Sequence, residues 1–492
     1  MALTRHHRAG QPTKDAATRR VAALLGAAIL AFLLLFQQGE ITVSDGATMY
    51  QETKSILHGS LSIPTQDSNG VAGVGGDHYS KYGIGLSVLA IPPYLLGKAV
   101  GGVVGHVDRV EQAAVASLMP LIAALLAVAI FLLAKRLGAS NRSAVLVGAG
   151  GVLGTYALPY GKDFFAEPLT ALFVTLTLER AIARRPMSAG AFLGAAGLTR
   201  AQSFILVPLV IPIIAWKQGT RAALRSLPPV LAAGVVQALL NVARFGSPLD
   251  FGYGGEGFTN NLFSGLTNLL LEPTKSVLLF APVVILLPPA LVLLWRRKRD
   301  ASILLTANLL VVTLMTATWY SWQGGWSWGP RLLLPGLLPA LAAVAVWIDA
   351  RRVNALMAVA TLALGFAVSA STLIVSTQAQ ELDKPTPAVG PGVLRQIELI
   401  EPTASYTRDH ALTAGHWNSH AGESRRFVNT WQVGAAREMG RAGLAAALVL
   451  SLVLGGVLVV TLSRLLRACR PMRSPSAPRT PLPATSSSET GA

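Results

Sequence analysis

The stretch 113-AAVASLMPLIAALLAVAIFLLA-134 contains no charged residue, and Lys135 and Arg136 follow it directly. A helix needs about 20 mainly apolar residues to cross the hydrocarbon core of a membrane. A helix packed on a soluble core would carry a polar stripe, and this one carries none. Three further blocks are equally free of charge, namely Val21–Phe36, Val277–Trp295 and Gly443–Leu462. The sequence therefore predicts an all-α polytopic membrane protein.

Composition and charge agree with this prediction. Apolar residues make up 52% of the 492 residues and charged residues 13%, about half the charged share of soluble domains. We predict twelve membrane spans, at 21–38, 113–134, 143–160, 166–183, 188–199, 201–216, 227–243, 277–295, 301–319, 332–348, 353–375 and 442–463.

The formal net charge of +17 follows from topology. With the N-terminus in the cytosol, the cytosolic connections hold 25 of the 41 Lys and Arg but only 5 of the 24 Asp and Glu. This is the positive-inside rule. The basic balance thus gives no reason to expect a nucleic acid as a partner. It predicts a multi-pass protein of the plasma or inner membrane with both termini cytosolic.

The predicted spans divide the chain into unequal parts. Residues 1–20 form a cytosolic segment and 21–375 a transmembrane module, in which 39–112 is a long first extracytoplasmic loop with interfacial helices. Within that loop, the apolar stretch Tyr82–Val104 is expected to lie in the outer interface, because counting it as a span would invert every later loop. An extracytoplasmic loop or small domain at 376–441, a last span at 442–463 and a disordered cytosolic tail at 464–492 complete the chain.

The first candidate for chemistry is Asp45, a few residues after the first span in Ser44-Asp45-Gly46. An aspartate before a helix commonly serves as an N-cap. The alternative interpretation is a general base at the outer membrane surface, and the two roles can coexist.

Two acids stand four residues apart at the outer entrance of the fourth span, Asp163 and Glu167. In a helix they would share one face. A solvated helix start with acids favoured by the helix dipole is one interpretation. Orienting a substrate hydroxyl or holding a divalent cation is the other, so a metal is left open.

The segment from Tyr320 to Arg331 is the most unusual, because it places Trp322, Trp326 and Trp328 among glycines. An interfacial aromatic belt would explain the tryptophans. The functional interpretation is a platform for a sugar or a prenyl chain, with Arg331 binding a phosphate through its two-pronged guanidinium. Further candidates for binding a phosphate-bearing donor are Arg200, Lys81 and the adjacent Tyr82. His410, His416 and His420 match no standard zinc spacing.

In this order, the motifs resemble those of the GT-C superfamily of glycosyltransferases that use polyprenyl-phosphate sugars, over roughly residues 20–350. The nearest types are the protein mannosyltransferases and the lipid A aminoarabinose transferases. The elements that carry the resemblance are Asp45, the helix starting at Tyr82-Gly83-Ile84-Gly85-Leu86, Lys135-Arg136-Leu137-Gly138, Glu167-Pro168, a Gly-Leu-Thr-Arg motif ending at Arg200, and Gly329-Pro330-Arg331. Gly46 departs from the pattern, because many protein mannosyltransferases have a second acid there.

The resemblance implies transfer of a sugar, with inversion, from a polyprenyl-monophosphate donor to a glycan, lipid or protein of the cell envelope. Asp45 would be the base and Arg331, Arg200 and Lys81 would hold the phosphate. A transporter or lipid flippase and a non-catalytic assembly partner are the alternatives. The enzyme hypothesis requires Asp45, Glu167, Arg200 and Arg331 to meet at one outer cavity.

Overall fold

The computed structural model describes residues 14–373 and 430–469, apart from 42, 66–68, 274 and 326. Most of the predicted extracytoplasmic region 376–441, with His410, His416 and His420, lies outside the described residues. So do the cytosolic tail beyond residue 469 and Trp326.

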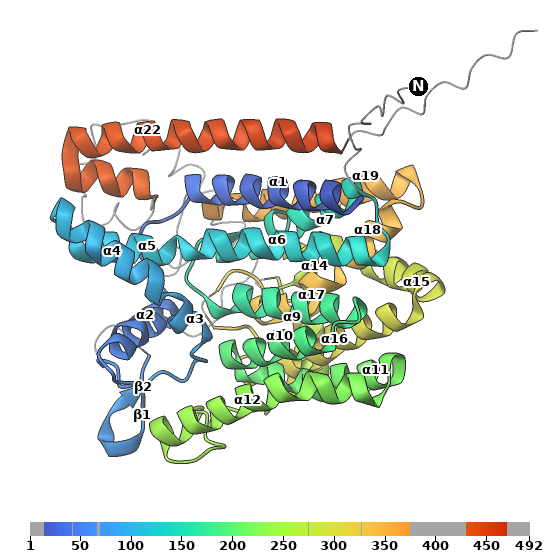
Figure 1. The fold of residues 1–492 in the computed structure, drawn as a ribbon, viewed down its shortest axis with the longest axis horizontal. Helices are drawn as coiled ribbons and strands as arrows, with labels where there is room; N and C mark the ends of the chain where they lie inside the picture. Colours follow the sequence, from blue (N-terminus) through green and yellow to red (C-terminus); the bar gives the residue numbers. More distant parts are fainter. Residues whose placement is uncertain are drawn as a thin grey trace, which may run out of the picture.

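The described chain is mostly helical, and its long helices run side by side across the molecule (Figure 1). Each helix of one series packs on the next, because most of its surface is apolar and has to be covered by another helix or by lipid. In order of packing, the series is α22 (Trp431–Ala468), α1 (Lys14–Leu35), α6 (Leu118–Leu137), α9 (Ala166–Ile182), α10 (Pro186–Thr199) and α12 (Thr220–Phe245).

A second group of helices completes the bundle, some packed directly on α6 or α9 and the others on one another. Its members are α7 (Asn141–Leu153), α8 (Ala157–Tyr160), α11 (Val207–Gln218), α14 (Val277–Phe280), α15 (Leu287–Arg297), α16 (Arg299–Thr318), α17 (Leu334–Ala340), α18 (Ala342–Ile348) and α19 (Arg352–Ser369). Short 3-10 turns join several of them, at η2 (Ala201–Leu206), η3 (Pro282–Leu286), η4 (Arg331–Leu333) and η5 (Ala370–Leu373).

Seven described helices are long and apolar enough to cross a membrane, and an eighth if the bent pair α17 and α18 counts as one span. The protein is thus a multi-pass membrane protein by length and composition. The remaining predicted spans fall on helices that are shorter or broken. α9 has 17 residues and α10 has 14, and α14, η3 and α15 divide 277–295 between them. The count of twelve therefore stays a prediction.

The predicted break at Arg200 is present. α10 ends at Thr199, Arg200 is extended (φ −143°, ψ 109°), and η2 starts at Ala201. The break turns the backbone where two short apolar segments meet, so the arginine projects from the end of a helix.

The predicted first extracytoplasmic loop contains short elements, and the last of them continues into α6 as one candidate span, Val107–Leu137. They are α2 (Ser44–Leu57), a β1–β2 hairpin (Val71–Ala72 and His78–Tyr79), η1 (Val74–Gly76), α3 (Gly85–Leu89), α4 (Ile91–Val104) and α5 (Val107–Ala116). With 14 residues, α4 is too short to cross the membrane. These elements lie at one end of the bundle (left in Figure 1). At the opposite end, α11 and α15 finish in turns that carry Lys217, Arg296 and Arg297.

Candidate active site

Residues from segments far apart in the sequence line one cavity of about 600 Å³. They include every residue that the enzyme hypothesis requires to meet, namely Asp45, Glu167, Arg200 and Arg331, together with Lys81 and Tyr82. Glu167 is in the first turn of α9, and the last turn of the same helix carries Arg180. The cavity is therefore at the end of the bundle away from the basic connections.

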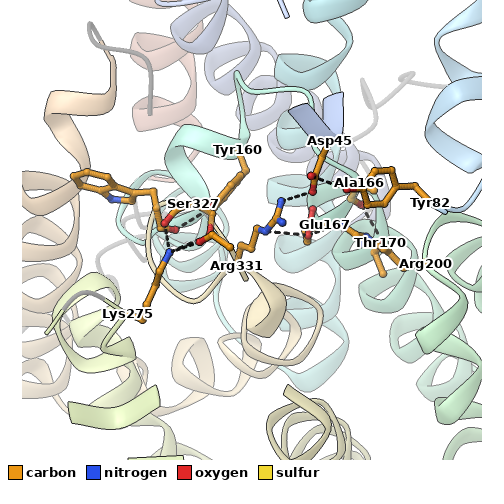
Figure 2. Close-up of polar contacts among 12 residues, drawn as sticks. Asp45, Tyr82, Tyr160, Ala166, Glu167, Thr170, Arg200, Lys275, Ser327 and Arg331 are labelled. Atoms are coloured by element: carbon orange, nitrogen blue, oxygen red, sulfur yellow. Dashed lines mark hydrogen bonds and ion pairs between the residues drawn. The ribbon is translucent and has the colours of Figure 1, made fainter. Parts of the chain in front are cut away.

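The charged residues form one continuous chain of contacts (Figure 2). Arg331 Nη1 lies 2.8 Å from Asp45 Oδ2, and its Nε lies 3.5 Å from Glu167 Oε1. The same carboxylate oxygen of Glu167 accepts a hydrogen bond of 2.6 Å from Arg200 Nη2. Asp45 and Arg331 are each only 9% exposed, so these charges interact across a largely desolvated space and strongly influence one another.

Two aromatic rings hold the guanidinium groups in place. Arg200 stacks over the ring of Tyr82 at 5.2 Å, and Arg331 over the ring of Phe165 at 4.6 Å. The buried Nε of Arg200 donates no hydrogen bond to the described residues, and that of Arg331 has only its 3.5 Å contact with Glu167. Since buried donors are normally satisfied, the site retains capacity for an acceptor such as a phosphate oxygen.

Asp45 is ionised in this setting. Its burial alone would raise the pKa of the carboxyl, but Arg331, Arg200 and the Tyr82 hydroxyl together hold the pKa below its ordinary value. That hydroxyl donates a hydrogen bond of 2.7 Å to Asp45 Oδ1. Burial, and then the charge of Asp45, raise the pKa of Tyr82 well above its usual range, so it remains a donor.

Glycines allow these segments to approach one another. A Cβ at Gly46 would lie 2.6 Å from the carbonyl oxygen of Phe164, and one at Gly83 would lie 2.4 Å from that of Leu198. Gly46 thus brings the start of α2 against the segment before α9, and Gly83 brings Tyr82 beside the end of α10. The missing second acid at position 46 has a steric reason, because no side chain fits there.

A buried ion pair anchors the segment that carries Lys81 and Tyr82. Arg244, at the end of α12, donates to the carbonyl oxygens of Ser80 (3.3 Å) and Tyr82 (3.2 Å) through Nη1. Its Nη2 lies 2.5 Å from Glu52 Oε1, and Glu52 also accepts from Ser87. Glu52 is seven residues after Asp45 on α2. The pair therefore fixes α2 and the 80–87 segment in the register in which Tyr82 reaches Asp45.

Lys275 anchors the segment that leads to Arg331. Its Nζ donates to the carbonyl oxygens of Gly325 and Ser327 (Figure 2). The Tyr160 hydroxyl donates to the Trp328 carbonyl at 2.7 Å. Because this segment is rich in glycine, such side-chain anchors replace the regular backbone pairing that it lacks.

Two sequence-based expectations need correction. Asp163 and Glu167 do not share a helix face, because α9 starts at Ala166 and Asp163 precedes it. Asp163 is buried and is not among the residues that line the cavity. Trp328 does not lie where a platform would have to be. The residue is only 5% exposed, its ring packs on Phe280, and its indole N–H donates to Ser369.

Trp322 likewise packs against the core and does not line the cavity. Aromatic residues that the sequence analysis did not single out line it instead, namely Trp319, Tyr320, Tyr253 and Phe258. Glu256 was also missed. It pairs with Lys81 at 2.5 Å, from a glycine-rich segment that carries no recognisable motif.

The described residues do not provide a metal site. No group of three or more His, Cys, Asp or Glu in the described part of the chain is arranged to hold a metal ion. The three carboxylates that line the cavity, Asp45, Glu167 and Glu256, are each engaged by a cationic side chain. Their surroundings suit an anion that would compete for the arginines.

Comparisons with known proteins show the fold. No protein-family model and no curated protein sequence matches the chain. Among solved structures, ArnT of Cupriavidus metallidurans bound to undecaprenyl phosphate matches with a TM-score of 0.52 at 12% identity, over 93% of this chain and 78% of that chain. Its apo form matches with 0.51 at 14% identity, over 92% and 76%.

The oligosaccharyltransferase of Archaeoglobus fulgidus matches with a TM-score of 0.53 at 12% identity, over 79% of this chain. The chain spans 60% of that protein's length. ArnT and the oligosaccharyltransferase are members of the GT-C superfamily, so the protein has a GT-C fold. The resemblance stated from the sequence is confirmed at the level of the fold.

Proposed function

We propose that this GT-C-fold protein transfers a sugar, with inversion, from a polyprenyl-monophosphate donor to an acceptor of the cell envelope. The observation that carries the proposal is the pairing of an ionised carboxylate, Asp45, with Arg331 in a cavity that Arg200 and Lys81 also line. A base for the acceptor and cations for the leaving group are thus within one site.

Asp45 would act as the general base. The acceptor hydroxyl attacks the anomeric carbon from the face opposite the phosphate, the bond from that carbon to the phosphate oxygen breaks, and Asp45 takes the hydroxyl proton. Such proton transfer contributes roughly 10²–10⁴-fold to a rate. Arg331 and Arg200 would stabilise the charge that develops on the departing polyprenyl phosphate.

The ion pair with Arg331 gives the base a switch. While Arg331 contacts Asp45, it holds the carboxyl pKa low, and a carboxylate of low pKa is a weak base. A donor phosphate that draws the guanidinium toward itself weakens this contact. The pKa of Asp45 then rises, so the base is strengthened when the donor is in place.

The orientation fits this chemistry. The cavity lies at the end of the bundle away from the basic turns, which the positive-inside rule assigns to the cytosol. We infer twelve spans in a plasma or inner membrane, with both termini cytosolic and the site facing outward. Donors carrying mannose or arabinofuranose are the first to test, with glycan, lipid or protein acceptors.

The test compares wild type with Asp45→Asn in proteoliposomes supplied with labelled polyprenyl-phosphate sugar and a cell-envelope extract. Asp77→Asn is the matched control, because Asp77 is an exposed acid of the same outer loop and does not line the cavity. We expect Asp45→Asn to lower transfer by roughly 10²–10⁴-fold while the variant folds and binds donor. Transfer at the wild-type rate would refute the assignment of the base. Movement of the labelled lipid from one leaflet of the bilayer to the other, without any product, would favour a flippase.

A further inference from the structure

The ion pairs that line the cavity differ in exposure. Those that join Asp45 and Glu167 to Arg331 and Arg200 have side chains no more than 12% exposed. In the remaining pair, the side chains of Lys81 and Glu256 are 18% and 24% exposed. Exposed pairs hold together less firmly than buried ones, because water competes for both charges. An incoming anion would therefore open the pair of Lys81 and Glu256 most readily.

The lysine of this pair is fixed. The two carbonyl groups that flank Lys81 in the chain, those of Ser80 and Tyr82, both accept hydrogen bonds from the buried guanidinium of Arg244. The Lys81 ammonium also lies 5.3 Å from the centre of the Tyr253 ring. If the pair opens, Lys81 stays at the cavity and its partner has to leave.

The glutamate is carried by a glycine-rich turn, in which its backbone N–H donates to the Tyr253 carbonyl at 2.6 Å and its side chain is only partly buried. It belongs to 251-FGYGGEGF-258, between α12 and α13 (Leu262–Leu271). Gly255 has a positive φ of 82°, and a Cβ there would meet no atom within 4 Å. After Glu256 the chain is tied down, because Tyr320 N donates to the Gly257 carbonyl at 2.9 Å. The Glu256 side chain can thus swing away from Lys81 while the loop keeps its anchor.

We propose that Glu256 is a gate on Lys81. Its carboxylate forms an ion pair with the lysine, and a lipid phosphate must displace that carboxylate when it binds. This rests on the proposed function and adds a specificity element to it. Anions that bind too weakly to displace Glu256 are rejected, because they meet a carboxylate at the entrance rather than a free ammonium. A phosphate, which offers several acceptor oxygens and a full charge, replaces it.

The gate makes a counterintuitive prediction, that removing a charged residue from the site strengthens binding. Glu256→Gln keeps the shape of the side chain but not its charge, so the phosphate no longer competes with a carboxylate. Partly exposed ion pairs contribute little energy, and we expect the dissociation constant of undecaprenyl phosphate to fall by roughly two- to tenfold. Lys81→Met should weaken binding, and Glu256→Gln added to Lys81→Met should change nothing further.

The measurement is a titration of the full-length protein in lipid nanodiscs with undecaprenyl phosphate. The matched control is Glu40→Gln, since Glu40 forms an ion pair with Arg109 at 3.4 Å in the same outer region and does not line the cavity. It should leave the affinity unchanged. Equal or weaker binding by Glu256→Gln, or the same tightening in the Lys81→Met background, would overturn the gate alone. Absence of binding by the wild type would overturn the proposed donor as well.

Discussion

Removing Arg244 should show that the buried pair with Glu52 sets both stability and the geometry of the site. Both side chains are almost completely buried, with exposures of 1% and 0%. Arg244→Met fills much of the same volume but leaves the carboxylate of Glu52 with Ser87 as its remaining partner. It also removes the donor to the carbonyl groups of Ser80 and Tyr82.

The structure sets the size of the effect. Breaking a buried pair by removing one partner costs about 3–5 kcal/mol, so Arg244→Met and Glu52→Met should each lower the free energy of unfolding by that amount. Independent effects would add to about 6–10 kcal/mol. The double variant leaves no unpaired charge. Its main loss is two carbonyl groups without a donor, at about 1–3 kcal/mol each. We therefore expect the double variant to lose only about 2–6 kcal/mol.

The pH dependence gives an independent check. Burial raises the pKa of Glu52, and Arg244 opposes the rise. Without Arg244 the pKa in the folded state is raised further. A carboxyl whose pKa is higher folded than unfolded destabilises the fold as the pH rises above the unfolded value, which is about 4.3. The loss of unfolding free energy in Arg244→Met, measured against wild type, should therefore be smaller at pH 5 than at pH 8.

Reversible unfolding in bicelles, followed by tryptophan fluorescence, would give these free energies. Undecaprenyl phosphate titrations on the folded fraction would report the site. We expect Arg244→Met to weaken binding, since Lys81 loses its anchor. Strict additivity of the two single variants, or single-variant losses under about 1 kcal/mol, would refute the assignment of a coupled buried pair.

Three further predictions test the site. At donor concentrations well below saturation, where the pKa of the free enzyme governs the rate, Asp45 protonation should not limit transfer above about pH 4, because its pKa is held below the ordinary value. A pH–rate profile under these conditions with an acid limb near pH 6 that disappears in Asp45→Asn would contradict this. Gly46→Ala should misfold or lose about 2 kcal/mol or more, judged by detergent-solubilised yield and thermal midpoint, because its Cβ would meet the Phe164 carbonyl at 2.6 Å. Trp319→Ala should weaken donor binding with little loss of stability, whereas Trp328→Ala should lower the free energy of unfolding by about 3–5 kcal/mol. The reverse outcome in binding and melting assays would restore Trp328 as the platform.

The sequence predicted the positions of the helices and of the main charged residues for a physical reason. Charge-free blocks have to lie in the membrane, so the charged residues between them are forced to its surfaces. Asp45, Glu167, Arg200 and Arg331 all lie near helix ends on one side of the bundle. Charged residues that are confined to the same surface of the bundle are favoured to meet in one cavity there.

The sequence did not predict which of those residues form ion pairs with one another. Which acid meets which base depends on how the helices are ordered around the bundle, and no local pattern encodes that order. Arg244 near the end of a span has the pattern of an ordinary snorkelling residue, although its guanidinium is buried. One error had an available signal. Proline is favoured in the first turn of a helix, so Pro168 indicates a start of α9 too late to include Asp163.

The pairing of charges also bears on the order of binding and release. In the cavity, Arg331, Arg200 and Lys81 are matched by three carboxylates, so an anion that binds there takes over cations that carboxylates already engage. Under the proposed function, the donor phosphodiester brings one negative charge and can replace one carboxylate. The monoester product carries roughly −1.5 to −2 at pH 7 and can replace up to two. The same site should therefore hold the spent lipid more firmly than the donor, and the return of the carboxylates to their cations assists its release.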